Sequence, residues 1–315
     1  MTQRFKIKQL GKLVNQEIVS DFLVTTKELR EGAKSKYLRL IFADDSGSMV
    51  GNIWSNAESF DDKFQEGDVV RIKAQVITYK GKYQLNVSKV KALLPEEFEL
   101  TQFVASTEKD INQLSEKLFL FIDSLQNELL QRLLSNIFDD KEFYSIFAQA
   151  PAAKSWNHNY VGGLLEHTVS VATICDFSSH HYPIDRDLLL AGAILHDIGK
   201  TREYSLKSSI DFTTEGRLVG HIPLGDQMIC QEIAKIDNFP KNLAMKLRHL
   251  ILAHHGEYEF ASARLPQTIE AVLLHQADNL DAQTVGVKQL IEAQQNDAAE
   301  WSDFDRLNNR FYYLK

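Results

Sequence analysis

The amino-acid sequence predicts a chain of two domains, an all-β domain followed by an all-α domain. Over residues 17–94, β-branched and aromatic residues partly alternate with polar ones, which is typical of strands. From residue 96, apolar residues instead recur at three- and four-residue spacing, which is typical of helices. The length of 315 residues suits this division, because a domain takes roughly 100–200 residues.

Charge and histidine are divided along the chain in the same way. Residues 1–95 carry sixteen Lys and Arg against eleven Asp and Glu, whereas residues 96–315 carry nineteen against thirty-two. All ten histidines lie at or after His158. We therefore expect a polyanion as the partner of the first domain and cations as the partners of the second.

The first domain, residues 1–95, is expected to contain five short strands. A polar stretch at 55–64 predicts a short helix or loop, and Lys80-Gly81 predicts a tight hairpin because Gly tolerates positive φ. Five strands with an interruption between the third and the fourth are typical of a small Greek-key barrel, the OB-fold. The strand segments are 17–29, 36–47, 48–54 and, on either side of the hairpin, 66–93.

Aromatic residues in this domain are interleaved with lysines and arginines. OB-folds hold single strands on such surfaces, because bases stack on aromatic rings while cations follow the phosphates. About half of the aromatic rings are expected to fill the barrel core instead. Strand alternation favours Tyr37, Arg39, Tyr79 and Tyr83 as the exposed nucleic-acid contacts.

The second half of the chain is predicted to be helical. Residues 96–150 are expected to form a helical connector or the start of the second domain, and Pro151 marks the next boundary. Residues 151–315 alternate helical segments with short loops, with one small hairpin expected around Asp211 and Gly216.

Seven histidine and aspartate side chains stand out in this region. The segment AGAILHDIGK (191–200) ends an apolar helix with an adjacent imidazole and carboxylate. Several helices would have to converge to bring all seven together, and a bundle core is a normal place for a metal site. Mixed His and Asp ligation suits Mn²⁺, Fe²⁺, Co²⁺ or Zn²⁺ better than Mg²⁺ alone. The candidate ligands are His167, His196, Asp197, His221, His254, His255 and Asp278.

Other polar residues have plainer interpretations. His180, His181 and His249 are expected to be surface or packing residues. His158 and His275 could orient ligands or satisfy local hydrogen bonds, and the sequence leaves both open. A solvated or capping role is favoured for Glu166, and a charge on the helix surface is favoured for Asp281, although help to a ligand is the alternative for Asp281.

The segments GGLLEHT, HDIGK and ADNLD, placed behind an OB-like domain, resemble the HD superfamily of metal-dependent phosphohydrolases. Within it they are similar to the YhaM-type 3′→5′ exoribonucleases, over essentially the whole chain. The resemblance implies an all-α HD-domain bundle at 151–315. It also implies that His167, His196, Asp197 and Asp278 hold one metal ion, and that a second is held by Asp197 with His221, His254 and His255.

The same resemblance implies an activity. Lys200 matches the lysine of an HD-x-x-K pattern that meets the substrate phosphate, so Asp197 and Lys200 are the expected catalytic residues. The expected reaction is 3′→5′ hydrolysis of single-stranded RNA, with single-stranded DNA as a secondary substrate, by water attack assisted by two metal ions. The products would be nucleoside monophosphates. Mn²⁺ is the favoured metal, with Mg²⁺, Co²⁺, Fe²⁺ and Zn²⁺ as alternatives.

Two other functions remain open at this level. The chain could hydrolyse a small nucleotide, with the OB domain serving as a regulatory module. It could also be a nucleic-acid-binding adaptor whose helical domain is catalytically inactive, although the full set of candidate ligands argues against this.

Composition limits the compartment. The N-terminus lacks the apolar core of a secretory signal, no stretch reaches the roughly 18 apolar residues of a membrane helix, and two cysteines occur in unrelated contexts. We therefore expect a cytoplasmic protein with no membrane partner. A homo-oligomer is compatible with the sequence, which does not determine the oligomeric state.

Overall fold

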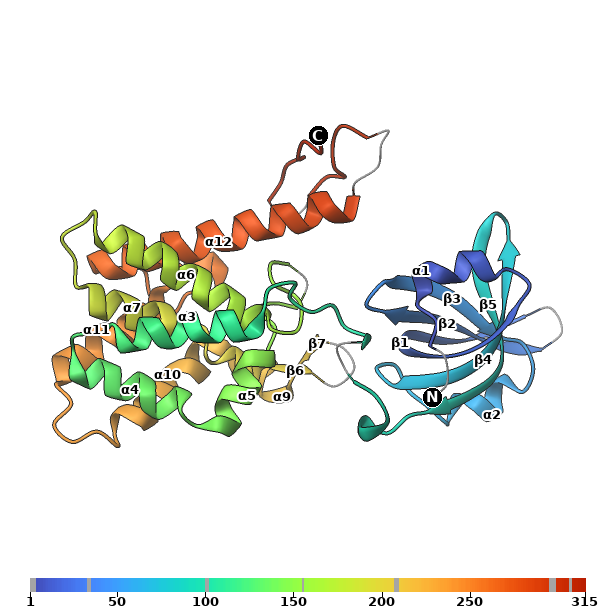
Figure 1. Ribbon diagram of the computed structural model, residues 1–315, viewed down its shortest axis with the longest axis horizontal. Coiled ribbons are helices and arrows are strands. Elements are labelled where there is room, and N and C mark those ends of the chain that lie inside the picture. The colour runs from blue at the N-terminus through green and yellow to red at the C-terminus, as the bar shows by residue number, and fades with distance from the viewer. Residues whose placement is uncertain are drawn as a thin grey trace. The chain divides into compact units, whose positions relative to one another are not determined.

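The computed structural model describes residues 4–32, 35–99, 102–154, 156–206, 210–294, 299–305 and 308–315. The chain divides into two compact units, the first comprising Met1–Ser106 with Leu206–Ile210 and the second comprising Thr107–Ser205 with Asp211–Lys315. The first is a barrel and the second a bundle of helices (Figure 1). Each unit is described by itself.

The first unit is a closed five-stranded barrel with the strand order β1-β2-β3-β5-β4. The strands β3 and β5 pair in parallel, and the other neighbouring strands are antiparallel. This topology confirms the predicted OB-fold barrel. Its elements are α1 (Ile7–Leu10), η1 (Gly11–Leu13), β1 (Glu17–Glu31), β2 (Lys36–Asp44), β3 (Gly47–Ile53), α2 (Ala57–Asp61), β4 (Val69–Tyr79) and β5 (Lys82–Ala92), followed by η2 (Pro95–Glu97).

Strand alternation places the barrel core. Along β2, Leu38, Leu40 and Phe42 are buried while the residues between them are partly exposed, as the period of two requires. The hairpin between β4 and β5 turns at Lys80 (φ 50°) and Gly81 (φ 76°), and Tyr79 pairs with Lys82. Positive φ at both central residues is the geometry that matches the twist of the flanking strands. The predicted hairpin is therefore confirmed.

The second unit is helical, as expected, with one small two-stranded sheet. The hairpin predicted around Asp211 and Gly216 is correct only in part: Asp211 lies in the second strand of this sheet, but the first strand begins at Tyr204. Gly216 lies in the helix Thr214–Val219, so the turn predicted there is wrong. The elements of the second unit are α3 (Ile111–Asp123), α4 (Glu128–Phe138), α5 (Lys141–Gln149), α6 (Gly163–Ser179), α7 (Arg186–Leu195), α8 (Lys200–Glu203), β6 (Tyr204–Leu206), β7 (Ile210–Phe212), α9 (Thr214–Val219), α10 (His221–Ile233), α11 (Lys241–Ala253), η4 (Tyr258–Phe260) and α12 (Ile269–Gln294).

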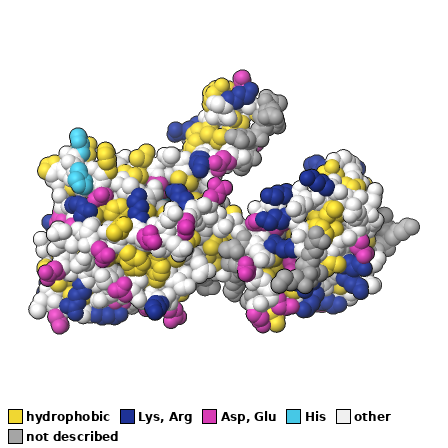
Figure 2. Space-filling view, in the orientation of Figure 1, with side chains coloured by type: hydrophobic (Ala, Val, Ile, Leu, Met, Phe, Trp, Pro, Cys, Tyr) yellow, Lys and Arg dark blue, Asp and Glu magenta, His cyan; other side chains and the backbone are white. Residues whose placement is uncertain are grey.

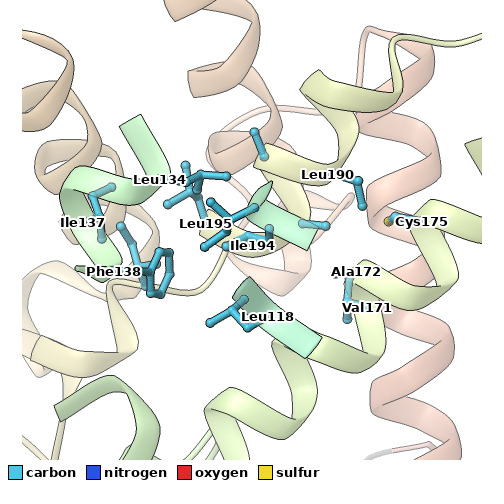
Figure 3. Packing of buried hydrophobic residues seen from close by; sticks show 14 of the residues in the cluster. Leu118, Leu134, Ile137, Phe138, Val171, Ala172, Cys175, Leu190, Ile194 and Leu195 are labelled. Carbon is cyan, nitrogen blue, oxygen red and sulfur yellow. The ribbon is translucent and has the colours of Figure 1, made fainter. Parts of the chain in front are cut away.

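The helix α7 lies at the centre of the bundle. Every residue from Leu188 to Leu195 is buried, so this helix is apolar on all sides and has neighbours all round. Figure 3 shows Leu190, Ile194 and Leu195 of α7 among buried side chains of α3, α4 and α6. Because the next residues in the chain are His196 and Asp197, the packing of α7 delivers this pair to the interior.

The helices α3, α4 and α5 belong to the same core as α6 and α7. Leu118, Leu133 and Phe147 are fully buried in the cluster that contains Leu195. Asp110, Asn127 and Asp140 cap these helices, because each side chain accepts hydrogen bonds from backbone N–H groups of the first turn. From Thr107 onward, the segment 96–150 that was expected to be a connector or the start of the second domain belongs to the helical unit, whereas Phe98 and Phe103 before it pack against the barrel.

No helix in the described part of the chain is long and apolar enough to cross a membrane. In the space-filling view, lysine and arginine side chains are spread over the visible face of the barrel (Figure 2).

Most of the candidate ligands are interior residues: His167, His196, Asp197 and His254 are all at most 1% exposed.

Candidate metal centre

Five helices bring the seven candidate ligands to one place in the bundle. His167 lies in α6, and Asp278 lies in α12. His196 and Asp197 follow the end of α7, while His254 and His255 follow the end of α11. His221 is the first residue of α10, directly after Gly220 with φ 80°. Residues 111 positions apart in sequence, His167 and Asp278, therefore converge.

One group of ligands surrounds the first side of Asp197. The Nε2 atoms of His167 and His196 are 3.2 Å apart, and Asp278 Oδ1 is 3.1 Å from His167 Nε2. Asp197 Oδ2 lies 3.5 Å from His167 Nε2 and 3.3 Å from His196 Nε2. These four side chains match the set that the resemblance assigned to one metal ion.

A second group faces the other carboxylate oxygen. Asp197 Oδ1 is 3.5 Å from His221 Nε2 and 3.6 Å from His254 Nε2. His221, His254 and His255 each offer a ring nitrogen, and these three atoms lie within 4.8 Å of one another. Asp197 thus stands between two groups of ligands, with one oxygen toward each, and a carboxylate has the lone pairs to serve both.

Hydrogen bonds fix the orientation of all five imidazoles. In each ring Nδ1 faces an oxygen that can only accept, so Nδ1 carries a hydrogen, and whenever the ring is neutral its lone pair lies on Nε2. The acceptors are Asp281 Oδ2 for His167 (2.7 Å), Ala193 O for His196 (2.9 Å), Glu203 Oε2 for His221 (3.0 Å), Ile251 O for His254 (2.7 Å) and Phe260 O for His255 (2.6 Å).

Electrostatics keep the buried carboxylates ionised. Burial by itself raises the pKa of Asp197, but Lys200 and His196 lower that pKa well below its usual value. The Lys200 ammonium nitrogen lies 2.6 Å from Asp197 Oδ2. Burial likewise opposes ionisation of Asp278, but the hydrogen bond from His167 and the electrostatic attraction of the neighbouring histidines together lower its pKa.

The pKa values of two histidines in the site are shifted in opposite directions by their surroundings. Burial and the neighbouring His254 lower the pKa of His255 to about 3, so this ring is neutral and able to ligate. Burial lowers the pKa of His167, but Asp278 and Asp281 raise it to about 10 overall. An excess of negative charge around His167 thus attracts a cation, whether a proton or a metal ion.

The residues fit divalent metal ions. In the described part of the chain, Asp197 Oδ1, His221 Nε2 and His254 Nε2 are buried and make no hydrogen bond. Buried polar atoms normally have partners because leaving them without one is costly. Metal coordination would satisfy all three, and the mixture of imidazole and carboxylate suits first-row divalent ions.

The sequence interpretation missed several residues around the ligands. The favoured interpretation of Asp281 as a helix-surface charge is wrong, because its side chain is 6% exposed and bonds to His167. Glu166 is not solvated either, since it is buried and accepts from Thr107 and Tyr160. Glu203, which orients His221, carried no recognisable signal beyond its place after the HD pair.

His158 and His275, whose roles the sequence left open, both contact residues of the site. His158 Nε2 lies 2.9 Å from Asp281 Oδ2, and His275 donates from Nδ1 to the backbone oxygen of His254 at 2.9 Å. His180 and His181 are exposed, and His249 accepts from the backbone N–H of Gln267.

The candidate nucleic-acid contacts lie on the barrel surface. Tyr79 is 55% exposed and Tyr83 is 49% exposed, while Tyr37 and Arg39 are partly exposed. Tyr37 stacks on Trp54, with ring centroids 4.6 Å apart, and Trp54 is itself half exposed. The sequence interpretation did not select Trp54, because only the pairing of β2 with β3 brings it beside Tyr37.

Two family models match the chain in the order of its two units. The model described as an OB-fold nucleic acid binding domain matches residues 23–93, and the HD domain model matches residues 164–283. Fold and site therefore define an HD-domain protein with an N-terminal OB-fold, a class of metal-dependent hydrolase.

Curated relatives identify the family within this class. The 3′-5′ exoribonuclease YhaM of Shouchella clausii (strain KSM-K16) is 31% identical over 303 residues, which cover 94% of this chain and 93% of that protein. The 3′-5′ exoribonuclease YhaM of Halalkalibacterium halodurans is 30% identical over 308 residues, with coverage of 95% and 93%. The chain belongs to the YhaM 3′-5′ exoribonuclease family.

Proposed function

We propose that this chain is a 3′→5′ exoribonuclease that hydrolyses single-stranded RNA with two divalent metal ions and releases nucleoside monophosphates. The observation that carries the proposal is the position of Asp197 between two groups of ligands, one per carboxylate oxygen. Family membership supports the direction and the substrate, because both relatives are named 3′-5′ exoribonuclease.

We assign His167, His196, Asp197 and Asp278 to one ion, and Asp197, His221, His254 and His255 to the other. Such a pair of ions supplies Lewis acidity for activating water and for stabilising charge on the phosphoryl oxygens. The chain's own part is to hold seven ligands in fixed orientations, with every imidazole bonded through Nδ1. Mn²⁺ is the proposed metal, with Mg²⁺, Co²⁺, Fe²⁺ and Zn²⁺ as alternatives.

Lys200 is proposed to contact the scissile phosphate. Its side chain is 11% exposed and its ammonium group lies beside Asp197. A fixed positive charge at this place would stabilise the negative charge that develops on the phosphoryl oxygens during attack. Catalysis then needs no covalent nucleophile from the chain.

The barrel is proposed to hold the RNA strand through Tyr37, Arg39, Tyr79 and Tyr83, with Trp54 added from its stack on Tyr37. Stacking accepts any base, so little sequence specificity is expected and single-stranded DNA is a proposed secondary substrate. Both cysteines are free, which accords with action in a reducing cytoplasm.

The proposal is tested with a single-stranded RNA carrying a label at its 5′ end. Incubation with the purified chain and Mn²⁺ is expected to give a ladder that shortens from the 3′ end, with nucleoside monophosphates as the released products. The Asp197→Asn variant should leave the RNA intact. A single internal cut would indicate an endonuclease instead. Intact RNA alongside turnover of small nucleotides would favour a nucleotide phosphohydrolase with a regulatory barrel.

A further inference from the structure

A buried hydrogen-bond network lies behind His167, on the side of the ring away from the other ligands. Asp281 Oδ2 is 2.7 Å from His167 Nδ1 and 2.9 Å from His158 Nε2, while Ser170 donates its hydroxyl hydrogen to Asp281 Oδ1. His158 and His167 are each 1% exposed. Asp281 thus accepts three hydrogen bonds in a place that bulk water does not reach.

The network continues beyond His158 and returns to α6. The hydroxyl of Tyr160 lies 2.9 Å from His158 Nδ1 and 2.9 Å from Glu166 Oε2. Glu166 also accepts from Thr107 Oγ1 at 2.5 Å and pairs with Lys109 at 3.0 Å. Because Glu166 precedes His167 in α6, the network begins and ends on the same helical turn.

His158 is held in an uncommon backbone conformation. Its φ is 49°, in the left-handed region that few residues other than glycine adopt. In this conformation the two nitrogens of its ring contact Asp281 and Tyr160. A buried, strained histidine with both nitrogens engaged suggests that the surrounding fold maintains this contact for a function.

The contact decides which nitrogen of His167 faces the metal centre. An ionised Asp281 can only accept, so Nδ1 of His167 keeps its hydrogen and Nε2 points to His196 and Asp278, at 3.2 and 3.1 Å. Without Asp281, neither the tautomer nor the rotation of this ring would be fixed. A carboxylate behind a ligating imidazole also raises its basicity as a ligand.

We propose that Asp281 is a positioning residue for His167, and that His158 holds Asp281 in place for this task. The proposal rests on the proposed function in one respect, namely that His167 ligates a metal ion. It adds that two residues outside the seven ligands determine the affinity of the centre for its metal.

The test is calorimetric titration of the full-length, metal-free chain with Mn²⁺. We expect Asp281→Ala to weaken Mn²⁺ binding by about 10- to 100-fold, the usual effect of removing such a partner. Asp281→Asn keeps an acceptor of the same size and should recover part of the affinity. His158→Asn, which tolerates the left-handed backbone, should fall between the two. The matched control is Asp176→Asn, which lies elsewhere on α6 and breaks an ion pair with Arg186 of α7. This variant should bind Mn²⁺ as tightly as the wild type does.

Turnover provides a second readout that a purely structural role would not give. The kcat of Asp281→Ala on RNA should drop at limiting Mn²⁺ and recover largely at saturating Mn²⁺, with the KM for RNA unchanged. A structural defect would lower activity at every metal concentration. If Asp281→Ala does not fold, as judged by circular dichroism, the Asp281→Asn and His158→Asn variants decide the matter.

The outcomes separate this proposal from the proposed function. Wild-type Mn²⁺ affinity in the folded Asp281 and His158 variants would overturn the positioning role alone, leaving the metal centre intact. If the wild type binds neither Mn²⁺ nor any of the four alternative metal ions, or if His167→Ala binds Mn²⁺ as tightly as the wild type, then His167 is not a ligand and both proposals fail.

Discussion

Asp197 is the residue on which both groups of ligands depend, because its two oxygens face different imidazoles. Oδ2 lies near His167 and His196, whereas Oδ1 lies near His221 and His254. Its side chain is 1% exposed, and the ammonium nitrogen of Lys200 lies 2.6 Å from Oδ2. Under the proposed function, Asp197 serves the metal ions and Lys200 serves the phosphate.

Replacing Asp197 with Asn should lower the metal content and abolish activity together. The amide has one oxygen and no charge, so it cannot serve both groups of ligands. We expect the Mn²⁺ content, measured by mass spectrometry after dialysis, to fall from two ions per chain to one or fewer. The control is Asp226→Asn, which disrupts an ion pair between Asp226 on α10 and Arg248 on α11 and should keep both metal ions. Full metal content in Asp197→Asn would contradict the shared carboxylate.

Replacing Lys200 with Ala should separate catalysis from metal binding. Loss of one charge-stabilising group typically lowers kcat by about 10²–10³-fold, while the seven ligands stay in place. Single-turnover RNA hydrolysis at saturating Mn²⁺ measures the effect, and titration checks that Mn²⁺ affinity is retained. Arg202→Ala removes a nearby surface ion pair with Glu215 and should have little effect on either quantity. An unchanged kcat in Lys200→Ala would rule out a role at the phosphate.

At the scale of elements, the site depends on how closely the segment after α7 approaches α10. The chain turns through His196 to Gly199, and a Cβ atom on Gly199 would lie 2.0 Å from the backbone oxygen of His221. The φ of Gly199 is −63°, so glycine is needed here for space and not for its backbone conformation. This contact sets the separation between the HD pair and the ligand His221.

Gly199→Ala should therefore weaken both the fold and the metal centre. Forcing an extra methyl group into a packed contact costs about 1–3 kcal/mol, so the melting temperature should fall and Mn²⁺ affinity with it. Gly225 on the facing helix offers a matched control, since its added Cβ would meet the nearest atom at 3.4 Å, an ordinary contact. Gly225→Ala should leave stability equal or slightly higher, because Ala favours helix. Equal melting temperatures for the two variants would show that α10 can move away.

At the scale of the whole molecule, two units of different class and charge are joined in one chain. The barrel carries the excess of lysine and arginine and the exposed aromatic rings, while the bundle carries the histidines and most of the acidic residues. Such a division predicts that RNA capture and phosphodiester hydrolysis respond to different substitutions.

The double variant Tyr37→Ala, Trp54→Ala should raise the KM for RNA without affecting the chemical step. Stacking is worth about 1–3 kcal/mol per base, which corresponds to an increase in KM of about 5- to 150-fold. Hydrolysis of a small activated phosphodiester should be unchanged. Phe177→Ala, which removes an exposed aromatic ring from α6 of the bundle, is the control. An RNA KM equal to that of the wild type would exclude this pair as a base platform. The variant Tyr79→Ala, Tyr83→Ala tests the second pair in the same way.

The sequence by itself determined the class of each unit and the identity of the seven candidate ligands. Periodicity is a local property: the alternation at Leu38, Leu40 and Phe42 and the turn at Lys80-Gly81 both follow from near neighbours in the chain. The candidate ligands were recognisable because His196 and Asp197 adjoin each other and the other five stand before and after this pair in a characteristic order. None of this required knowing which helices pack together.

Tertiary structure alone decided how those side chains are oriented and supported. The hydrogen bonds that His167 donates to Asp281 and that His221 donates to Glu203 join different helices, and Trp54 meets Tyr37 only across a strand pair. Each of these partners looks like an ordinary polar or aromatic residue in the sequence, because burial and tautomer depend on contacts between distant segments. The convergence of five helices on Asp197 likewise depends on how the apolar helix α7 packs among its neighbours. The apolar sequence of α7 predicts that the helix is buried, but it does not predict the direction in which the Asp197 carboxylate points.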